Sequence, residues 1–462
     1  MTIKVPCGQK SGCVTVPASK SWAHRMLITA ALSENGCDII CDGISKDISA
    51  TVKCLNALGA NISMSNEDGH NTIIKVKPVV KTFDHSGNSA MYAHLPCGES
   101  GSTLRFMIPI AGALGIDAAF HMEGRLSERP LGPLTDVLSE HGMSFIKDGQ
   151  ILYCRGQLKG GNFDIPGNIS SQYISGLLMA LPVLPENSAL NVTGTVESGD
   201  YIEMTVRAVE AAGIRFDRQG YLFNISGNQK YRVAGKLTVE KDWSSAAFPL
   251  CMGAFSQEGM TVTGLNLDSV QGDKEIVNIL DKFGAEINIY FPENNMEEGI
   301  QSELSSGITL AEYRSLAEKD KEIKGKLAAI TVRRGKLEGQ IIDASRIPDL
   351  VPVISVVAAG AIGETRIIHA ERLRIKESDR LATTTAMLKA LGADIEETED
   401  GLLIHGKNAL SGGTVDSFND HRIAMSAAVA AGICSSEVTV NGAECTDKSF
   451  PGFWDVIDSL HA

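Results

Sequence analysis

The sequence predicts an α/β protein built from several copies of one small module. A single phrase recurs along the chain: the end of an apolar helix, a glycine, and then a run typical of a strand. The apolar spacing before the glycine indicates an amphipathic helix, and the glycine suits a left-handed helix end. The phrase occurs at Gly59, Gly142, Gly213, Gly284 and Gly392.

The spacing of this phrase indicates the size of the module. Copies recur roughly every 70 residues, which is too long for a solenoid unit and enough for two helices and several strands. The interval from Gly284 to Gly392 is longer than the others. Residues 291–326 fill that gap and are polar and highly charged, so we expect a surface insertion there.

Composition limits the class of protein. A chain of 462 residues should form more than one unit. The net charge of −14 disfavours nucleic acid or an anionic membrane as a partner. The ten cysteines show neither C-x-x-C nor zinc-like spacing, which predicts reduced thiols and no metal site. No signal sequence and no long apolar run is evident, so we expect a cytoplasmic protein.

Cations and hydroxyls gather where apolar helices are expected to begin. Lys20 lies at one such start, with Arg25 about one turn inside. A cation there opposes the helix dipole, so we expect a compensating anion, and phosphate is the natural candidate. Residues 98–105 (GESGSTLR) form a glycine-rich loop whose backbone N–H groups could hold an anion, although the P-loop pattern is absent.

Further motifs of this kind follow along the chain. Residues 372–380 (RLRIKESDR) are the densest, and the alternation of Arg372, Arg374 and Lys376 suggests one face of a strand. Glu377 and Arg380 are then three apart, as on a helix face. The others are residues 169–173 (ISSQY), the start of a helix at Asp349, residues 418–422 (FNDHR) and the loop containing Lys448.

Each motif alone is also explained by helix capping or by a solvated face. Together they share one form, with cationic or polar residues at the starts of apolar helices throughout the chain. In a modular fold such helix starts can converge, so the set predicts a site for small phosphorylated substrates.

The same motifs carry a resemblance to a known family. Lys20-Ser21 with Arg25, GESGSTLR, SERP, SSQ, IPD, RIKESDR, NDHR and CTDKSFP occur in this order over nearly the whole chain. In these motifs the chain closely resembles the EPSP synthases, the 3-phosphoshikimate 1-carboxyvinyltransferases. The resemblance implies two similar lobes, each of three βαβαββ units. It places one lobe at residues 1–20 plus 241–462 and the other at 21–240, with substrates bound as the lobes close.

The resemblance also implies a reaction. The enolpyruvyl group of phosphoenolpyruvate is transferred to the 5-hydroxyl of shikimate 3-phosphate, and phosphate is released. Addition and then elimination proceed through a tetrahedral intermediate on the route to chorismate and the aromatic amino acids. The family implies a monomer without cofactor, and these two small molecules as its only partners.

Site residues are carried over by motif. Asp349 is implied as the base near the accepting hydroxyl, Glu377 as the group that moves the methylene proton, and Lys20 as acid or phosphate ligand. The phosphoenolpyruvate ligands implied are Lys20, Gly101, Arg129, Gln172, Arg380, Arg422 and Lys448. The shikimate 3-phosphate ligands implied are Ser21, Arg25, Ser170, Ser171, Gln172, Ser198, Asp349 and Lys376. Supporting positions are Tyr201 and His421.

Two departures and two alternatives accompany this interpretation. Glu99 and Ser100 precede Gly101 where the family often has Asn-Ala, and Arg372 stands where it often has Asn. The related transferase that acts on UDP-N-acetylglucosamine carries a catalytic Cys five residues before its anion-binding Arg, whereas Gly124 holds that position here. A non-catalytic anion-binding protein would have no use for both Asp349 and Glu377 as acid and base.

Overall fold

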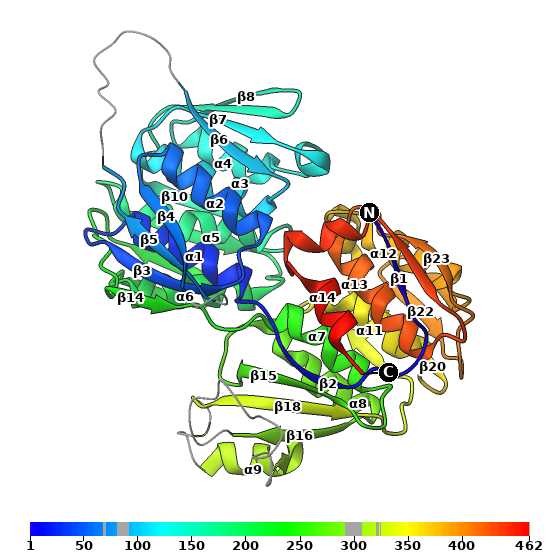
Figure 1. Cartoon of the computed structure of the whole chain (residues 1–462). Helices are drawn as coiled ribbons and strands as arrows, with labels where there is room; N and C mark the ends of the chain where they lie inside the picture. The colour runs from blue at the N-terminus through cyan, green and yellow to red at the C-terminus, as the bar shows by residue number, and fades with distance from the viewer. Residues whose placement is uncertain (68–70, 81–91, 292–306, 320–322, 324, 462) are drawn as a thin grey trace. The chain divides into compact units, whose positions relative to one another are not determined.

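The structure is a computed structural model that describes residues 1–67, 71–80, 92–291, 307–319, 323 and 325–461 (Figure 1). These residues form two compact units. Unit 1 consists of Met1–Ser19 and Glu240–Ala462, and unit 2 consists of Lys20–Val239. Within the described ranges, no helix combines the length and the apolar character that crossing a membrane requires.

Unit 2 contains three four-stranded sheets of the same topology. In the middle one the strand order is β6 (Ala93–Gly98), β7 (Ala118–Met122), β9 (Ile151–Arg155) and β8 (Ser144–Asp148). The helices α3 (Gly101–Leu114) and α4 (Gly132–Glu140) lie between β6 and β7 and between β7 and β8 in the chain. The β6–β7 pair is parallel and the other two pairs are antiparallel, which gives a βαβαββ module.

The other two modules of unit 2 repeat this plan. One contains β14 (Lys236–Thr238), β3 (Cys37–Asp42), β5 (Asn71–Lys77) and β4 (Asn61–Glu67), with α1 (Lys20–Ala31) and α2 (Lys46–Ala57). The other contains β10 (Gly161–Pro166), β11 (Ser188–Thr193), β13 (Leu222–Ile225) and β12 (Phe216–Gln219), with α5 (Ser171–Ala180) and α6 (Gly199–Ala211). Because β14 comes from the end of the unit and pairs in parallel with β3, it serves as the first strand of its module.

Unit 1 has three sheets on a similar plan, with five, four and three strands. The first has β2 (Gly12–Thr15), β15 (Met260–Asn266), β18 (Leu327–Arg333), β16 (Glu286–Tyr290) and β17 (Ile308–Thr309), with α7 (Trp243–Gly253) and α8 (Ile276–Phe283). The second has β19 (Ile341–Asp343), β20 (Glu364–Ile368), β22 (Leu402–His405) and β21 (Asp394–Glu397), with α11 (Val351–Ala359) and α12 (Arg380–Ala390). The third has β23 (Gly413–Asp416), β24 (Val438–Asn441) and β1 (Thr2–Val5), with α13 (His421–Ala430) and α14 (Phe453–Ser459).

The recurring glycine phrase marks the end of one helix in five of the modules. All five glycines have φ between 88° and 101°, a left-handed conformation that side chains with a Cβ seldom adopt. A strand follows each of them, at β4, β8, β12, β16 and β21. The prediction of a repeated α/β module is therefore confirmed, and with it the βαβαββ plan.

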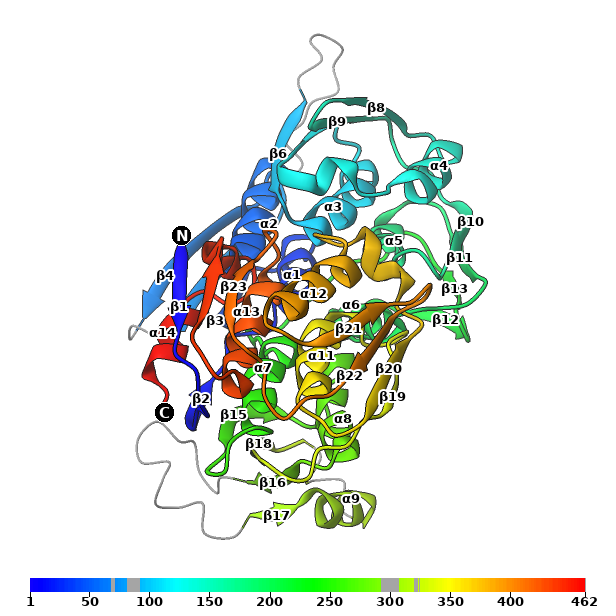
Figure 2. The ribbon, with the colours of Figure 1, turned by 90° about the vertical axis from the view of Figure 1, so that its right-hand side faces the viewer.

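The first helix of each module is largely buried. In unit 2, α3 packs on α5 and α5 on α6, and in unit 1, α11, α12 and α13 pack on one another (Figure 2). Such helices keep apolar side chains all round. Their polar residues therefore stand at their first turns, which explains the motifs found in the sequence.

The expected insertion at residues 291–326 lies partly outside the described residues. Its described part contains β17, which pairs with β16, and α9 (Leu310–Lys319). Arg314 on α9 donates to Asp281 Oδ2 (2.9 Å) and to Asn278 Oδ1 (2.7 Å), both on α8. This part of the segment therefore extends the edge of the first sheet of unit 1.

Candidate active site

The first residue of α1 is a cation that already has an acidic neighbour. Lys20 Nζ donates to Asp47 Oδ2 at 2.9 Å, and both side chains are mostly buried. Asp47 lies in the first turn of α2. The sequence reasoning missed Asp47, because an acidic residue in a first helical turn is commonplace and carries no functional signal.

Arg25 is buried and is held by neutral groups. Its Nε donates to Thr205 Oγ1 (2.7 Å), and its Nη2 donates to the Tyr201 carbonyl (2.9 Å) and to Ser175 Oγ (3.3 Å). Burial lowers the pKa of Arg25 to about 9, which leaves it charged at neutral pH. Among the described residues no carboxylate lies within ion-pair distance of it, so an anionic ligand would compensate this charge.

At the first residue of α3, Gly101, a side chain would collide with two arginines. Ser100 caps the helix by accepting a hydrogen bond from the Thr103 amide. A Cβ at Gly101 would lie 2.5 Å from Arg129 Nη1 and 2.6 Å from Arg105 Nη1. The glycine therefore allows two guanidinium groups to reach the first turn of α3.

Arg105 was not assigned from the sequence and proves to be buried. Its Nη1 donates to the Gly101 carbonyl (3.3 Å) and its Nη2 to the Pro130 carbonyl (3.2 Å). It thereby connects the glycine loop to the segment that carries Arg129. The motif GESGSTLR ends at this arginine, so its position in the loop was the available signal.

The first turns of α5 and α6 supply the remaining polar groups of unit 2. Ser170 caps α5 by accepting from the Gln172 amide, and Gln172 Nε2 donates to Ser102 Oγ on α3 at 2.8 Å. Ser171 is buried next to them. Ser198 precedes α6 with φ of 52°, an uncommon conformation for serine that occurs more often at functional positions.

In unit 1, Asp349 is the acceptor for several cations. It lies in the short helix η4 (Pro348–Leu350). Arg380 Nη1 donates to its Oδ1 at 2.8 Å, and Arg422 Nη2 lies 3.1 Å from its Oδ2. Lys376 Nζ is 3.9 Å away. Three of the cations expected from the sequence therefore meet at one carboxylate.

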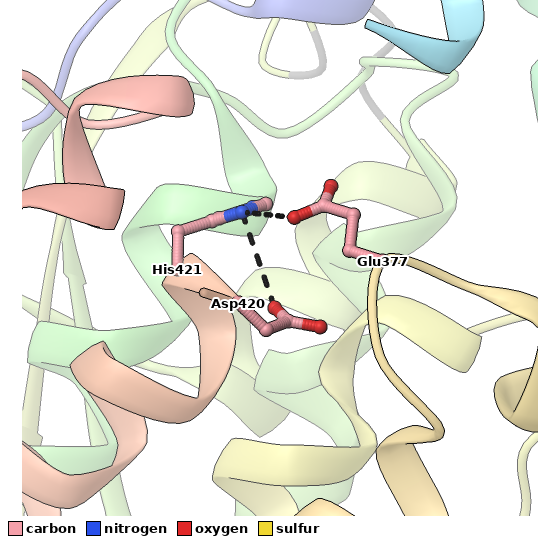
Figure 3. Close-up of side chains that lie close together, drawn as sticks. All are labelled: Glu377, Asp420 and His421. Carbon is pink, nitrogen blue, oxygen red and sulfur yellow. Dashed lines mark hydrogen bonds and ion pairs between the residues drawn. The ribbon is translucent and has the colours of Figure 1, made fainter. Parts of the chain in front are cut away.

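A second acidic group, Glu377, shares Arg380 with this set and lies beside His421 and Asp420 (Figure 3). His421 Nδ1 is 2.9 Å from Glu377 Oε2, and Arg380 Nη2 is 3.8 Å from Glu377 Oε1. Burial favours the protonated form of Glu377, but the charges of His421, Arg380 and Lys448 outweigh it and hold its pKa well below the ordinary value. Glu377 is therefore ionised at neutral pH and can accept a proton.

Asp420 anchors Arg380 and was quoted in the NDHR motif without a role. It caps α13 by accepting from the Arg422 amide, and it accepts from Arg380 Nε at 2.8 Å. Burial raises the pKa of Asp420, but the Arg380 charge overcomes this and keeps it below its usual value. Asp420 thus fixes the guanidinium that contacts Asp349.

Glu377, Asp420 and His421 are the one group of possible metal ligands found in the described part of the chain, with ligand atoms within 4.8 Å of one another. Arg380 contacts both carboxylates. A guanidinium at that position competes with a metal cation for the same oxygens. The cluster is better suited to holding and moving a proton than to binding a metal.

Lys448 ends the short helix η7 (Ala443–Lys448) and is mostly buried. Its Nζ donates to the Asn419 carbonyl at 2.7 Å. Phe418 and Asn419 both have positive φ, 53° and 54°. This strained turn directs a carbonyl toward Lys448 immediately before Asp420 and His421.

Two local expectations were wrong. Residues 371–375 form the short helix η5 (Glu371–Ile375), not a strand. A 3-10 helix has three residues per turn, so alternate residues do not share a face. Arg374 accordingly pairs with Glu397 at 2.9 Å, Arg372 donates to the Ser345 carbonyl at 3.1 Å, and only Lys376 approaches Asp349. Glu377 also precedes α12, whose cap is Asp379.

The predicted site residues form two sets, one in each unit. Unit 2 holds Lys20, Ser21, Arg25, Gly101, Arg129, Ser170, Ser171, Gln172, Ser198 and Tyr201. Unit 1 holds Asp349, Lys376, Glu377, Arg380, His421, Arg422 and Lys448. Buried cations next to two acidic groups that can exchange protons define the class as an enzyme for anionic substrates.

Comparison with known proteins makes the identification specific. The family model described as EPSP synthase (3-phosphoshikimate 1-carboxyvinyltransferase) matches residues 6–457. The chain belongs to this family. The 3-phosphoshikimate 1-carboxyvinyltransferase of Clostridium acetobutylicum is 40% identical over 459 residues, which cover 98% of this chain and 96% of that protein. The protein of the same name from Clostridium perfringens is 40% identical over 452 residues, covering 97% and 96%.

Solved structures agree on the fold. An EPSP synthase from Acinetobacter baumannii matches with a TM-score of 0.73 and 24% identity, covering 100% of both chains. The expected fold class and the resemblance to this family are thus confirmed.

Proposed function

We propose that this enzyme transfers the enolpyruvyl group of phosphoenolpyruvate to the 5-hydroxyl of shikimate 3-phosphate and releases phosphate. Membership of the family and the names of the relatives support this reaction. The observation that carries it is the arrangement in unit 1, where two acidic side chains, Asp349 and Glu377, both contact Arg380. Addition and elimination need a group to take a hydroxyl proton and another to move a carbon-bound proton.

Asp349 is the proposed base for the hydroxyl of shikimate 3-phosphate. Its negative charge is held between Arg380 and Arg422. As the hydroxyl oxygen attacks the enolpyruvyl carbon, its proton passes to this carboxylate. Lys376, close to Asp349, is proposed to orient the shikimate ring in the same place.

Glu377 is the proposed group for the proton on carbon. Its carboxylate is ionised at neutral pH and therefore free of the proton it would accept from the methyl group in the elimination step, with His421 Nδ1 at 2.9 Å beside it. In the addition step the methylene carbon must gain a proton, and Lys20 is the proposed donor or a ligand of the phosphate.

The remaining cations are proposed to hold the anionic groups. Arg129, Gln172 and the Gly101 amide of unit 2, with Arg380, Arg422 and Lys448 of unit 1, would bind phosphoenolpyruvate and stabilise departing phosphate. Ser21, Arg25, Ser170, Ser171, Gln172 and Ser198 would bind shikimate 3-phosphate, supported by Tyr201. The reaction as proposed needs ligands from both sets. We further propose that the enzyme is a cytoplasmic monomer in the pathway to chorismate.

The test is phosphate release by the purified protein. Release with both substrates, and none when either is omitted, is the expected result. Release only with UDP-N-acetylglucosamine as acceptor would assign the alternative transferase activity. Binding of phosphoenolpyruvate and shikimate 3-phosphate without turnover, in a folded protein, would indicate a non-catalytic anion-binding protein instead.

A further inference from the structure

A buried carboxyl group that the proposed reaction does not use lies in unit 1. Asp273 belongs to the short helix η3 (Gly272–Glu275), and its side chain is almost entirely buried. Ser244 Oγ donates to its Oδ2. Its Oδ1 is also buried and has no hydrogen-bond partner among the described residues. Burying a carboxylate with one unsatisfied oxygen costs free energy. A protonated carboxyl group is neutral, so burial favours this form.

Charged groups face Asp273 from three neighbouring elements. Asp349 of η4 and Asp242, which caps α7, place negative charges near it, and Arg422 of α13 places a positive one. Burial, and then the charge of Asp349, raise the pKa of Asp273 to about 7, against the opposing effects of Arg422 and Ser244. Asp273 is therefore electrostatically linked to the proposed base.

Other charged groups near Asp273 have partners of their own. On η3 itself, Lys274 Nζ donates to the Leu267 carbonyl at 3.4 Å, and Glu275 accepts from Asn278 at 2.7 Å. On α8, Asp281 is paired with Arg314 at the surface.

We propose that Asp273 holds a proton in the resting enzyme and is a positioning residue that sets the basicity of Asp349. The proton lies on Asp273 at rest while Asp349 keeps its charge between Arg380 and Arg422. When Asp273 loses that proton to solvent, a second negative charge stands near Asp349. Asp349 then becomes the stronger base toward the substrate hydroxyl.

The consequence is a step in the rate that depends on pH. With both substrates saturating, kcat should rise as Asp273 ionises around neutral pH. Asp273→Asn keeps the shape of the side chain but cannot ionise. Its kcat should match that of the wild type at pH 6 within about twofold. At pH 8 its kcat should be roughly three- to tenfold lower than that of the wild type. Asp281→Asn makes the same chemical change on an exposed ion pair and should follow the wild-type profile at both pH values.

The proposal rests on the proposed role of Asp349, so its closing test does not depend on turnover. Carboxyl carbons of aspartate labelled with ¹³C are followed by NMR as a function of pH in the intact chain. We expect one resonance that titrates near neutral pH, that is absent from Asp273→Asn, and that titrates at lower pH in Asp349→Asn.

Two results would overturn the proposal. One is a resonance from Asp273 that is already ionised at pH 6. The other is a midpoint that stays unchanged in Asp349→Asn, which would mean that burial alone holds the proton. If the enzyme gives no turnover with its proposed substrates but the resonance shifts as expected, the proposed reaction fails while the proton on Asp273 and its link to Asp349 stand.

Discussion

The guanidinium of Arg422 contacts Asp349 twice. Its Nη1 donates to the Asp349 backbone carbonyl at 2.9 Å, and its Nη2 lies 3.1 Å from the carboxylate. A planar group with several fixed donors can do this, and a lysine ammonium on a flexible stem cannot reproduce the same fork.

Arg422→Lys should therefore misplace the proposed base while keeping the charge. We expect a loss of about 2–3 kcal/mol of transition-state stabilisation. It appears as a lower kcat/KM in steady-state assays of phosphate release. Arg366→Lys is the matched control, because Arg366 makes only an exposed pair with Glu364. Equal activities in the two variants would contradict the assignment of Arg422.

Lys448→Met tests the cation nearest to the strained turn at Asn419. As a proposed ligand of phosphoenolpyruvate, Lys448 should contribute about 2–4 kcal/mol to the transition state, and kcat/KM should fall accordingly. Lys407, whose Nζ donates to the Gly392 carbonyl on an exposed surface, is the control residue for the same change. An unchanged kcat/KM in Lys448→Met would refute the role.

Gly101→Ala tests the space before α3. The added methyl would displace Arg129 and Arg105, whose guanidinium atoms lie 2.5 and 2.6 Å from its position. We expect the KM for phosphoenolpyruvate to rise about tenfold or more, with the KM for shikimate 3-phosphate less affected. In Gly132→Ala, the nearest atom to the new methyl is 3.8 Å away, so both KM values should stay unchanged.

Asp420→Asn tests the buried ion pair that holds Arg380. The asparagine keeps an oxygen for the helix cap but leaves the charge of Arg380, almost wholly buried, without this partner. Breaking such a pair costs about 3–5 kcal/mol of the free energy of unfolding. Urea unfolding followed by circular dichroism measures this, and Asp281→Asn at an exposed pair should cost less than about 1 kcal/mol.

The pH dependence of stability follows from the lowered pKa of Glu377. Its folded-state value lies well below the ordinary one, so its ionised form favours the folded chain. That contribution is present above the ordinary pKa of about 4.3 and is lost as the pH falls through the lower folded value. Glu377→Gln lacks it, so its loss of stability on acidification should be smaller than that of the wild type. Parallel curves would show that Glu377 is not linked to folding.

Much of the fold could be predicted from the sequence, because it depends on the local preferences of helix ends and strands. Each copy has a helix, a glycine and then a strand, because the left-handed conformation at the helix end strongly favours glycine. The recurrence of polar residues around helix starts explains why Lys20, Gly101, Gln172, Glu377 and His421 could be selected without coordinates. The run 372–376 was misassigned because alternation alone does not separate a strand from a short 3-10 turn.

What only the tertiary structure decided is which groups neutralise one another. Asp47 faces Lys20 from 27 residues away, and Asp420 faces Arg380 from 40 residues away. No local pattern carries such pairings, because Coulomb energies and burial depend on distance in space and not along the chain. The sequence by itself determined the family, the repeated module and the candidate residues. The packing of separate modules determined which of those residues are buried, which are ionised and where Asp273 stands beside the proposed base.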